Sequence, residues 1–173
     1  MSCLSRHLSQ STFILVSSAG SGLFSSRCFV GLDYGLLHAL LRSEYFEEAD
    51  SFTSSTLRKL AGKRAVTRGY VYFSEVKAIP GDDLITLDRL WRAFSQGRFG
   101  FSVQAKLLNS LGGRYDRLWP RIGWKESGVW TRYPNAFNWS IEAKEGHMPL
   151  INQLRGVRLM DALLSHPALI SRR

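Results

Sequence analysis

The sequence predicts an all-α protein, a single compact helical domain with short, irregular, aromatic-rich loops. The chain has 173 residues, 45% of them hydrophobic, which suits one domain with one core. Apolar residues recur every three or four positions in several stretches, as they do along one face of a helix. Strand-like alternation is limited to short segments, and two strands alone would make a marginal sheet.

Residues 1–32 differ in composition from the rest and are left out of the fold prediction. They contain nine serines and two arginines, and the first acidic residue of the chain is Asp33. This composition is typical of an organelle transit peptide, and a disordered tail is the alternative. Both cysteines, Cys3 and Cys28, lie here. We therefore expect a domain of residues 33–173 without a disulfide, a zinc–cysteine site or a cysteine nucleophile.

Two consecutive helices are predicted after this leader. Helical spacing of apolar residues extends over residues 34–41 and, after a break near Ser43, over residues 46–60. The stripe of the first helix is Tyr34, Leu37, Leu40 and Leu41, and that of the second is Phe46, Ala49, Thr53, Thr56, Leu57 and Leu60.

The third and fourth helices have start and stop signals. Asp82 or Asp83 is the expected N-cap of the third, and Gly97 ends it. Ser102 is the expected N-cap of the fourth, which two consecutive glycines end. Their apolar stripes are Leu84, Leu87, Leu90, Trp91 and Phe94, and then Val103, Leu107, Leu108 and Leu111.

The rest of the chain is less regular. Apolar and polar residues alternate over residues 137–143, which predicts a strand, and more weakly over residues 70–76. A last helix is predicted for residues 150–165, stopped by His166 and Pro167. Short helices and loops are expected around three tryptophans, which stand among prolines and glycines: Trp119, Trp124 and Trp130.

Sequence signatures of enzymes are missing. The chain has no phosphate-binding loop, dinucleotide fingerprint, nucleophile elbow or His-x-x-x-His pair. His38, His147 and His166 are far apart in the sequence and have no acids at ligand spacing, so no metal site is expected. The pair Asp82 and Asp83 precedes a helix, and we interpret it as a cap. The sequence therefore predicts a protein that is not an enzyme.

The segment joining the third and fourth helices, residues 97–102, has the sequence Gly-Arg-Phe-Gly-Phe-Ser. Its glycines allow tight turns that present an aromatic ring beside a cation, next to a helix N-terminus that favours anions. This combination suits a flat anionic ligand. The alternative is a joint whose phenylalanines fill the core.

A second group of aromatic and basic residues follows near the C-terminus. Aromatic faces with guanidinium groups suit a planar apolar ligand with carboxylate arms, and equally nucleic-acid bases and phosphates. The net charge of +9 fits either ligand. The group comprises Phe137, Trp139, Lys144, His147, Met148, Arg155 and Arg158.

Several motifs occur in order over about residues 34–149. They include Ala49-Asp50-x-x-Thr53, Asp83-Leu84-x-x-Leu87-Asp88-x-Leu90-Trp91, Gly97-Arg98-Phe99-Gly100-Phe101-Ser102-Val103-Gln104 and Gly146-His147-Met148-Pro149. In composition and order they resemble the genomes-uncoupled-four family, the porphyrin-binding regulators of magnesium chelatase in oxygenic phototrophs.

This resemblance implies an all-helical domain shaped like a cupped hand, with a concave ligand surface. It implies binding of protoporphyrin IX and Mg-protoporphyrin IX, with bilins as further candidates, and stimulation of magnesium chelatase through its large, porphyrin-binding subunit. Roles in chlorophyll biosynthesis, pigment shielding and plastid signalling follow. The expected protein is a monomer without a cofactor of its own, in the chloroplast stroma or at the surface of plastid membranes.

The resemblance also assigns ligand-binding residues. One side of the cup would be lined from two loops, and the other from the aromatic residues that follow. Two arginines near the C-terminus would pair with the porphyrin carboxylates. The first side comprises Arg64, Val66, Tyr70, Val71, Arg98, Phe99 and Phe101; the second comprises Trp130, Tyr133, Phe137, Trp139 and Met148; and the arginines are Arg155 and Arg158.

Two other functions remain as alternatives. Gly97-Arg98-Phe99-Gly100 is also a Gly-x-x-Gly loop, as in RNA-binding K-homology domains, although those need a three-stranded sheet that this sequence does not predict. Because that sheet is not predicted, no nucleic-acid partner is expected. An enzyme acting on the tetrapyrrole is disfavoured because no acid and base pair with a common location can be named.

Overall fold

The computed structural model describes residues 32–151 and 157–170, so nearly all of the predicted leader lies outside the described residues. The described chain is mostly helical, which confirms the predicted fold class. Its helices are α1 (Gly35–Arg42), α2 (Phe46–Ala61), α3 (Lys63–Arg68), the 3₁₀-helix η1 (Phe73–Ala78), α4 (Gly81–Ala93), α5 (Phe101–Ser110), α6 (Tyr115–Arg121), α7 (Val157–Leu164) and α8 (Pro167–Ile170).

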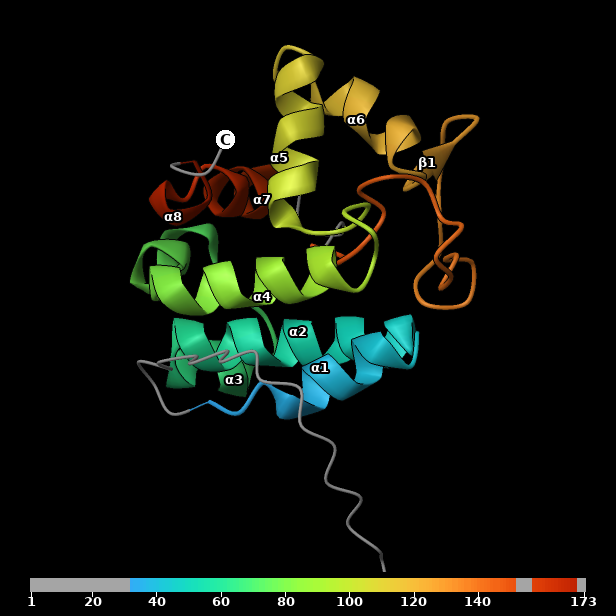
Figure 1. Ribbon diagram of the computed structural model, residues 1–173. Coiled ribbons are helices and arrows are strands. Elements are labelled where there is room, and N and C mark those ends of the chain that lie inside the picture. Colours follow the sequence, from blue (N-terminus) through green and yellow to red (C-terminus); the bar gives the residue numbers. More distant parts are fainter. Residues whose placement is uncertain (1–31, 152–156, 171–173) are drawn as a thin grey trace, which may run out of the picture.

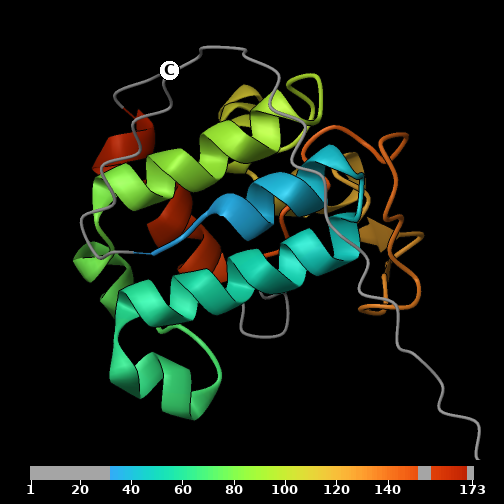
Figure 2. The same cartoon turned by 60° about the horizontal axis from the view of Figure 1, so that its bottom comes forward.

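Helix α4 lies at the centre of the domain, with α1 and α2 on one side and α5, α7 and α8 on the other (Figure 1). Figure 2 shows α1 lying between α2 and α4. Helix α7 packs on η1 and α5, and α8 packs on α4. A short hairpin of β1 (Lys125–Glu126) and β2 (Val129–Trp130) stands at one edge. Among the described helices, none is long and apolar enough to cross a membrane.

Large aromatic side chains join α2 and α4 in the core. Phe46 and Trp91 are nearly parallel, with ring centroids 6.2 Å apart, and Phe99 meets Phe46 edge-on at 5.7 Å. The indole N–H of Trp91 donates a hydrogen bond to Thr53 Oγ1 at 3.0 Å. The buried indole therefore has a partner inside the core, which fixes the rotation of α4 relative to α2.

The first four predicted helices are confirmed as α1, α2, α4 and α5, but the predicted caps of the last two are wrong. Helix α4 begins at Gly81, after Pro80, and no side chain caps it. Proline is suited to this position because its ring fixes φ, here −61°, and it has no backbone N–H that needs a partner. Asp82 and Asp83 lie within the first helical turn. Buried Asp83 accepts a hydrogen bond from the Tyr34 hydroxyl at 2.7 Å and so fastens α1 to α4.

Ser102 does not cap α5, which begins at Phe101 after Gly100. The cap comes from α4: Asp88 accepts hydrogen bonds from the backbone N–H and the hydroxyl of Ser102, both at 2.8 Å. Gly100 has φ +133°, and a Cβ there would lie 2.8 Å from Asp88 Oδ1. The close approach of α4 therefore requires glycine.

Both predicted strands are wrong. Residues 137–143 form bends and one turn, and Trp139 Nε1 donates a hydrogen bond to the preceding Pro134 carbonyl at 3.0 Å. Residues 73–78 form η1, because the Glu75 carboxylate accepts the Tyr72 N–H at 2.8 Å and starts a helical turn.

The C-terminal helix is shorter than predicted. Leu150 and Ile151 are not helical, residues 152–156 lie outside the described residues, and α7 covers Val157–Leu164. The predicted stop before Pro167 is confirmed, and α8 follows. Helix α3 and the β1–β2 hairpin were not predicted, because each has too few residues to produce a periodic pattern.

Candidate ligand-binding site

A half-open pocket lies between α2, the turn after α3, and α7. Its walls are mainly aliphatic, with one cation, Arg58, and one aromatic ring, Tyr70. A pocket of this composition suits an apolar ligand that carries an anionic group. The lining residues are Ser54, Leu57, Arg58, Gly69, Tyr70, Val71, Val76, Ile79, Leu150, Ile151, Leu159 and Leu163.

Asp50 attaches one wall of this pocket to α2. Its Oδ1 accepts a hydrogen bond from the backbone N–H of Leu150 at 2.6 Å. Burial raises the pKa of the Asp50 carboxyl to about 7. The hydrogen bond from Leu150 N–H opposes this rise, and the nearby charge of Glu47 adds to it. The residue thus fixes the segment from which the chain continues toward α7.

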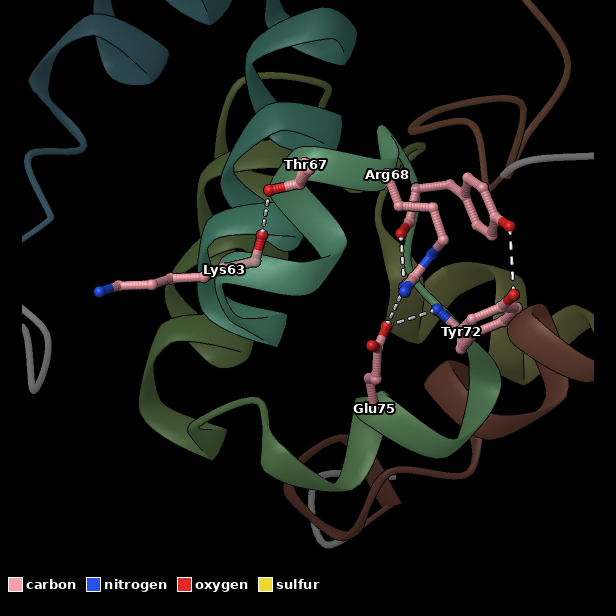
Figure 3. A network of polar contacts seen from close by, with 6 residues as sticks. Lys63, Thr67, Arg68, Tyr72 and Glu75 are labelled. Carbon is pink, nitrogen blue, oxygen red and sulfur yellow. Dashed lines mark hydrogen bonds and ion pairs between the residues drawn. The ribbon is translucent and has the colours of Figure 1, made fainter.

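A compact polar network forms the wall after α3 (Figure 3). The guanidinium carbon of Arg68 lies 4.6 Å from the ring centroid of Tyr70 and 3.9 Å from that of Tyr72. Arg68 also donates to the Tyr70 carbonyl at 3.0 Å and pairs with Glu75. The Tyr72 N–H and Arg68 hold the pKa of the Glu75 carboxyl below its usual range. Two predicted site residues, Tyr70 and Val71, line the pocket here.

Two other predicted residues lie on α3. Val66 is 50% exposed, and Arg64 is also exposed. Arg64 is close enough to Glu75 for its charge to lower the pKa of that carboxyl. Neither side chain lines the pocket.

The loop at residues 97–100 is integrated into the core. Its four backbone N–H groups are occupied: Gly97 donates to Arg92, Arg98 to the Ser95 carbonyl, Phe99 to Ser95 Oγ, and Gly100 to the Met148 carbonyl. An anion or a nucleic-acid phosphate would need some of these amides. In this conformation the loop therefore has no free amide for an anion or a phosphate, and a ligand-binding role for the loop stays a prediction.

Phe99, Phe101 and Met148 are fully buried. They therefore present no surface to a ligand in this conformation and fill the core instead, which was the alternative interpretation. Arg98 is partly buried and donates to the Ala143 carbonyl at 2.7 Å. Together with the bond from the Gly146 N–H to the Arg98 carbonyl at 2.8 Å, it holds the 143–148 segment in place.

Three of the residues predicted for the second side of the cup form an aromatic cluster. Tyr133, Phe137 and Trp139 lie with ring centroids 5.5–6.0 Å apart, and Tyr133 is 50% exposed. Partial burial and the nearby charges of Asp50 and Glu47 raise the pKa of the Tyr133 hydroxyl. Tyr133 therefore lies close enough to α2 to be influenced by the charges of Asp50, Glu47 and Arg58.

Trp130 belongs to a different aromatic stack. Its ring centroid is 5.5 Å from that of Trp119, which is itself stacked on the buried ring of Trp124 at 5.7 Å. Trp130 remains 42% exposed, and Lys125 Nζ lies 5.4 Å from its ring centroid. Trp130 is a residue of strand β2 and packs on Trp119, so it does not belong to the Tyr133 cluster.

The predicted C-terminal arginines are only partly described. Arg155 lies outside the described residues. Arg158 is exposed on α7, with its guanidinium carbon 5.6 Å from the ring centroid of Phe73. It stands near the pocket edge formed by Leu159 of the same helix.

Buried His147 has a structural environment. Its Nδ1 lies 2.6 Å from the Ile122 carbonyl oxygen, and burial holds the pKa of its imidazole below the usual value. Within residues 32–151 and 157–170, no cluster of three or more His, Cys, Asp or Glu side chains could hold a metal ion. The pocket lining likewise contains no carboxylate or imidazole.

This combination of a mostly helical fold with an apolar pocket that contains one arginine and one tyrosine is that of a helical ligand-binding domain. The GUN4-like family model matches residues 28–167, and the chain belongs to that family. The predicted resemblance is thereby confirmed, and it extends beyond residues 34–149.

Individual relatives agree in fold and sequence. The structure of GUN4 from Chlamydomonas reinhardtii superimposes with a TM-score of 0.76 at 40% identity, covering 81% of this chain and 91% of that one. A Ycf53-like protein of Synechocystis is 44% identical over 164 residues, 94% of this chain and 70% of the relative. The Arabidopsis thaliana protein named "Tetrapyrrole-binding protein, chloroplastic" is 38% identical over 144 residues, 78% of this chain and 54% of the relative.

Sequence reasoning missed most of the pocket lining. Arg58 stands in a basic stretch with no acid between Asp50 and Glu75, and that charge excess was the one available signal. Leu57 and the α7 residues Leu159 and Leu163 have the same local spacing as core residues. These leucines are exposed to the pocket only because α2 and α7, which are far apart in the sequence, pack near each other.

Proposed function

We propose that this chain binds a cyclic tetrapyrrole of the protoporphyrin type, protoporphyrin IX or its magnesium form, in the pocket beside α2. The observation that carries the proposal is the position of Arg58 in a mainly aliphatic pocket. The exposed ring of Tyr133 also lies close to α2. Family membership and the name of the Arabidopsis relative support the choice of ligand.

The chemistry of the ligand matches that of the pocket. The macrocycle is flat and apolar, so aliphatic walls and aromatic faces favour its transfer from water. Its two propionate carboxylates need cations at the pocket edge. Arg58 stands in the lining, while Arg64 lies near Glu75 and Arg158 lies over the ring of Phe73. Such burial with paired carboxylates is compatible with about 8–10 kcal/mol of binding free energy.

We propose further that the protein is a carrier and activator, which presents the tetrapyrrole to the large subunit of magnesium chelatase. A pocket lined without carboxylate or imidazole offers no acid and base pair for chemistry on the ring, which supports a carrier rather than an enzyme. A location in the plastid is proposed from the chloroplastic Arabidopsis relative and from the predicted leader.

Titration with a water-soluble protoporphyrin analogue tests the binding proposal. Saturable quenching of tryptophan emission and a red shift of the Soret band are expected at low micromolar concentration or below. Absence of saturable binding in that range would remove the proposal. Addition of the protein to a magnesium chelatase assay then tests activation separately, because binding without stimulation would retain the carrier and reject the activator.

A further inference from the structure

We propose that Arg68 is a positioning residue for the ligand: it holds Tyr70 and Tyr72 in place and so preforms one wall of the pocket. This inference rests on the proposed function, because it concerns the same pocket. Arg68 is not among the residues that line the pocket. It acts through Tyr70 and the neighbouring Val71, which do.

The guanidinium of Arg68 is bound on several sides. It contacts the faces of Tyr70 and Tyr72, whose hydroxyl oxygens lie 3.3 Å apart. One of its nitrogens donates to both the Tyr70 carbonyl and Glu75 Oε2. The same Glu75 oxygen accepts the Tyr72 N–H at 2.8 Å. Figure 3 shows the hydrogen bonds and the ion pair by which Arg68 and Glu75 bridge this turn.

The turn depends on these side-chain contacts. Helix α3 has only six residues, and the residue that follows it, Gly69, has a left-handed conformation with φ +83°. Tyr72 is 47% exposed, so burial alone fixes its ring weakly. Without the Arg68 contacts, the turn would gain conformational freedom that a ligand must remove on binding, which lowers affinity.

The arginine has a supporting role rather than that of an anion receptor. Arg68 and Glu75 are each about one-fifth exposed, with side-chain values of 21%. The charge of Arg68 is compensated by Glu75, whereas Arg58 stands in the pocket lining itself. We therefore assign carboxylate recognition to Arg58 and ring placement to Arg68.

The test is porphyrin titration of the full chain and of Arg68→Gln, Arg68→Lys and Arg114→Gln. Arg68→Gln should bind about tenfold or more weakly, because the ring contacts and the ion pair are both lost. Arg68→Lys retains a cation near the rings and should recover part of the affinity. Arg114→Gln is the matched control, since it removes an exposed pair with Asp116 away from the pocket, and it should bind like the wild type.

Circular dichroism separates positioning from general stability. Arg68→Gln should change the near-ultraviolet tyrosine signal and the induced Soret signal of the bound porphyrin, while its unfolding midpoint remains close to that of Arg114→Gln. If Arg68→Gln fails to fold, Glu75→Gln serves instead. It retains Arg68 and an amide oxygen that can accept the Tyr72 N–H, and it should weaken binding to an intermediate degree.

The outcomes distinguish this inference from the proposed function. Suppose that the wild type binds porphyrin and that the Arg68 variants bind it equally well, with an unchanged induced Soret signal. This result would overturn the positioning role alone. Absence of porphyrin binding by the wild type would overturn the proposed function and this inference with it. Weakened binding by Arg68→Gln that Arg68→Lys partly restores would support the inference.

Discussion

The carboxylate of Asp50 in α2 accepts a hydrogen bond of 2.6 Å from the backbone N–H of Leu150, one hundred residues further along the chain. The bond joins the long helix beside the pocket to the segment that completes the pocket wall. Because Asp50 is only 1% exposed, the charge that makes this bond strong is also costly to bury. The link between α2 and Leu150 should therefore depend on pH.

Asp50→Asn should abolish one pH dependence of stability. Burial raises the pKa of Asp50 from an ordinary value of 3.8 to about 7, so the folded state binds more protons than the unfolded state between these values. The resulting stability is fully present below about pH 4 and is lost as pH rises to about 7. Above pH 7 the neutral Asn variant should be more stable by on the order of 3 kcal/mol.

Urea unfolding of wild type and Asp50→Asn from pH 4 to pH 8 measures this effect. His147 and His166 have lowered pKa values and give the opposite slope, since the stability that each contributes is lost as pH falls below about 6.5. That contribution is common to both proteins and cancels in their difference. Asp82→Asn, at an exposed position of α4, is the control. Parallel pH profiles for wild type and Asp50→Asn would contradict the prediction.

Thr53→Val should destabilise the core through Trp91. The variant leaves the fully buried indole N–H without its partner, which should lower the free energy of unfolding by about 1–3 kcal/mol. Thr86→Val is a matched control, because both threonine hydroxyls donate at 2.8 Å to the carbonyl four residues earlier but Thr86 meets no indole. Equal losses for the two variants in urea unfolding would show that the indole bond contributes nothing.

Gly100→Ala should cost more than Gly97→Ala. Both glycines have positive φ, so each substitution introduces backbone strain of about 1–2 kcal/mol. At Gly97 the new methyl group meets nothing within 4 Å, whereas at Gly100 it would lie 2.8 Å from Asp88 Oδ1 and disturb the cap of α5. The total cost at Gly100 should reach about 3–4 kcal/mol. Thermal unfolding of the pair measures the difference, and a smaller loss at Gly100 would refute this account of the cap.

Arg58→Gln should weaken porphyrin binding without loss of stability. A charge-assisted bond to a carboxylate contributes about 1.5–3 kcal/mol, so affinity should fall roughly 10–100-fold. Arg89→Gln removes an exposed arginine of α4 outside the pocket and should leave affinity unchanged. The wild-type affinity should also fall more steeply with added salt than that of Arg58→Gln. Equal dissociation constants for the two variants would exclude Arg58 from carboxylate recognition.

Local pattern in the sequence predicted much of the fold. The apolar stripes that include Leu37, Thr53 and Leu87 set the faces of α1, α2 and α4, because a buried face must recur at the helical period. The motif order likewise identified the family. The predicted N-caps, Asp82 or Asp83 and Ser102, were wrong because each helix begins one or more residues earlier, after Pro80 and Gly100. The side chains of Asp83 and Ser102 bond instead to other elements.

The candidate site divides in the same way. Tyr70 and Val71 line the pocket, Tyr133 belongs to an aromatic cluster outside the lining, and Phe99 and Phe101 are in the core. Sequence composition does not distinguish an aromatic ring that faces a ligand from one that faces another helix. That distinction depends on which surfaces the packed helices cover.

The sequence by itself determined the class of fold and the family, both of which follow from residue type and spacing. Only the tertiary structure decided which residues share a pocket. Arg58 and Leu159 meet there across about one hundred residues of chain, and Asp50 contacts Leu150 over a similar separation. Such contacts arise from the packing of whole helices, and local periodicity contains no information about them.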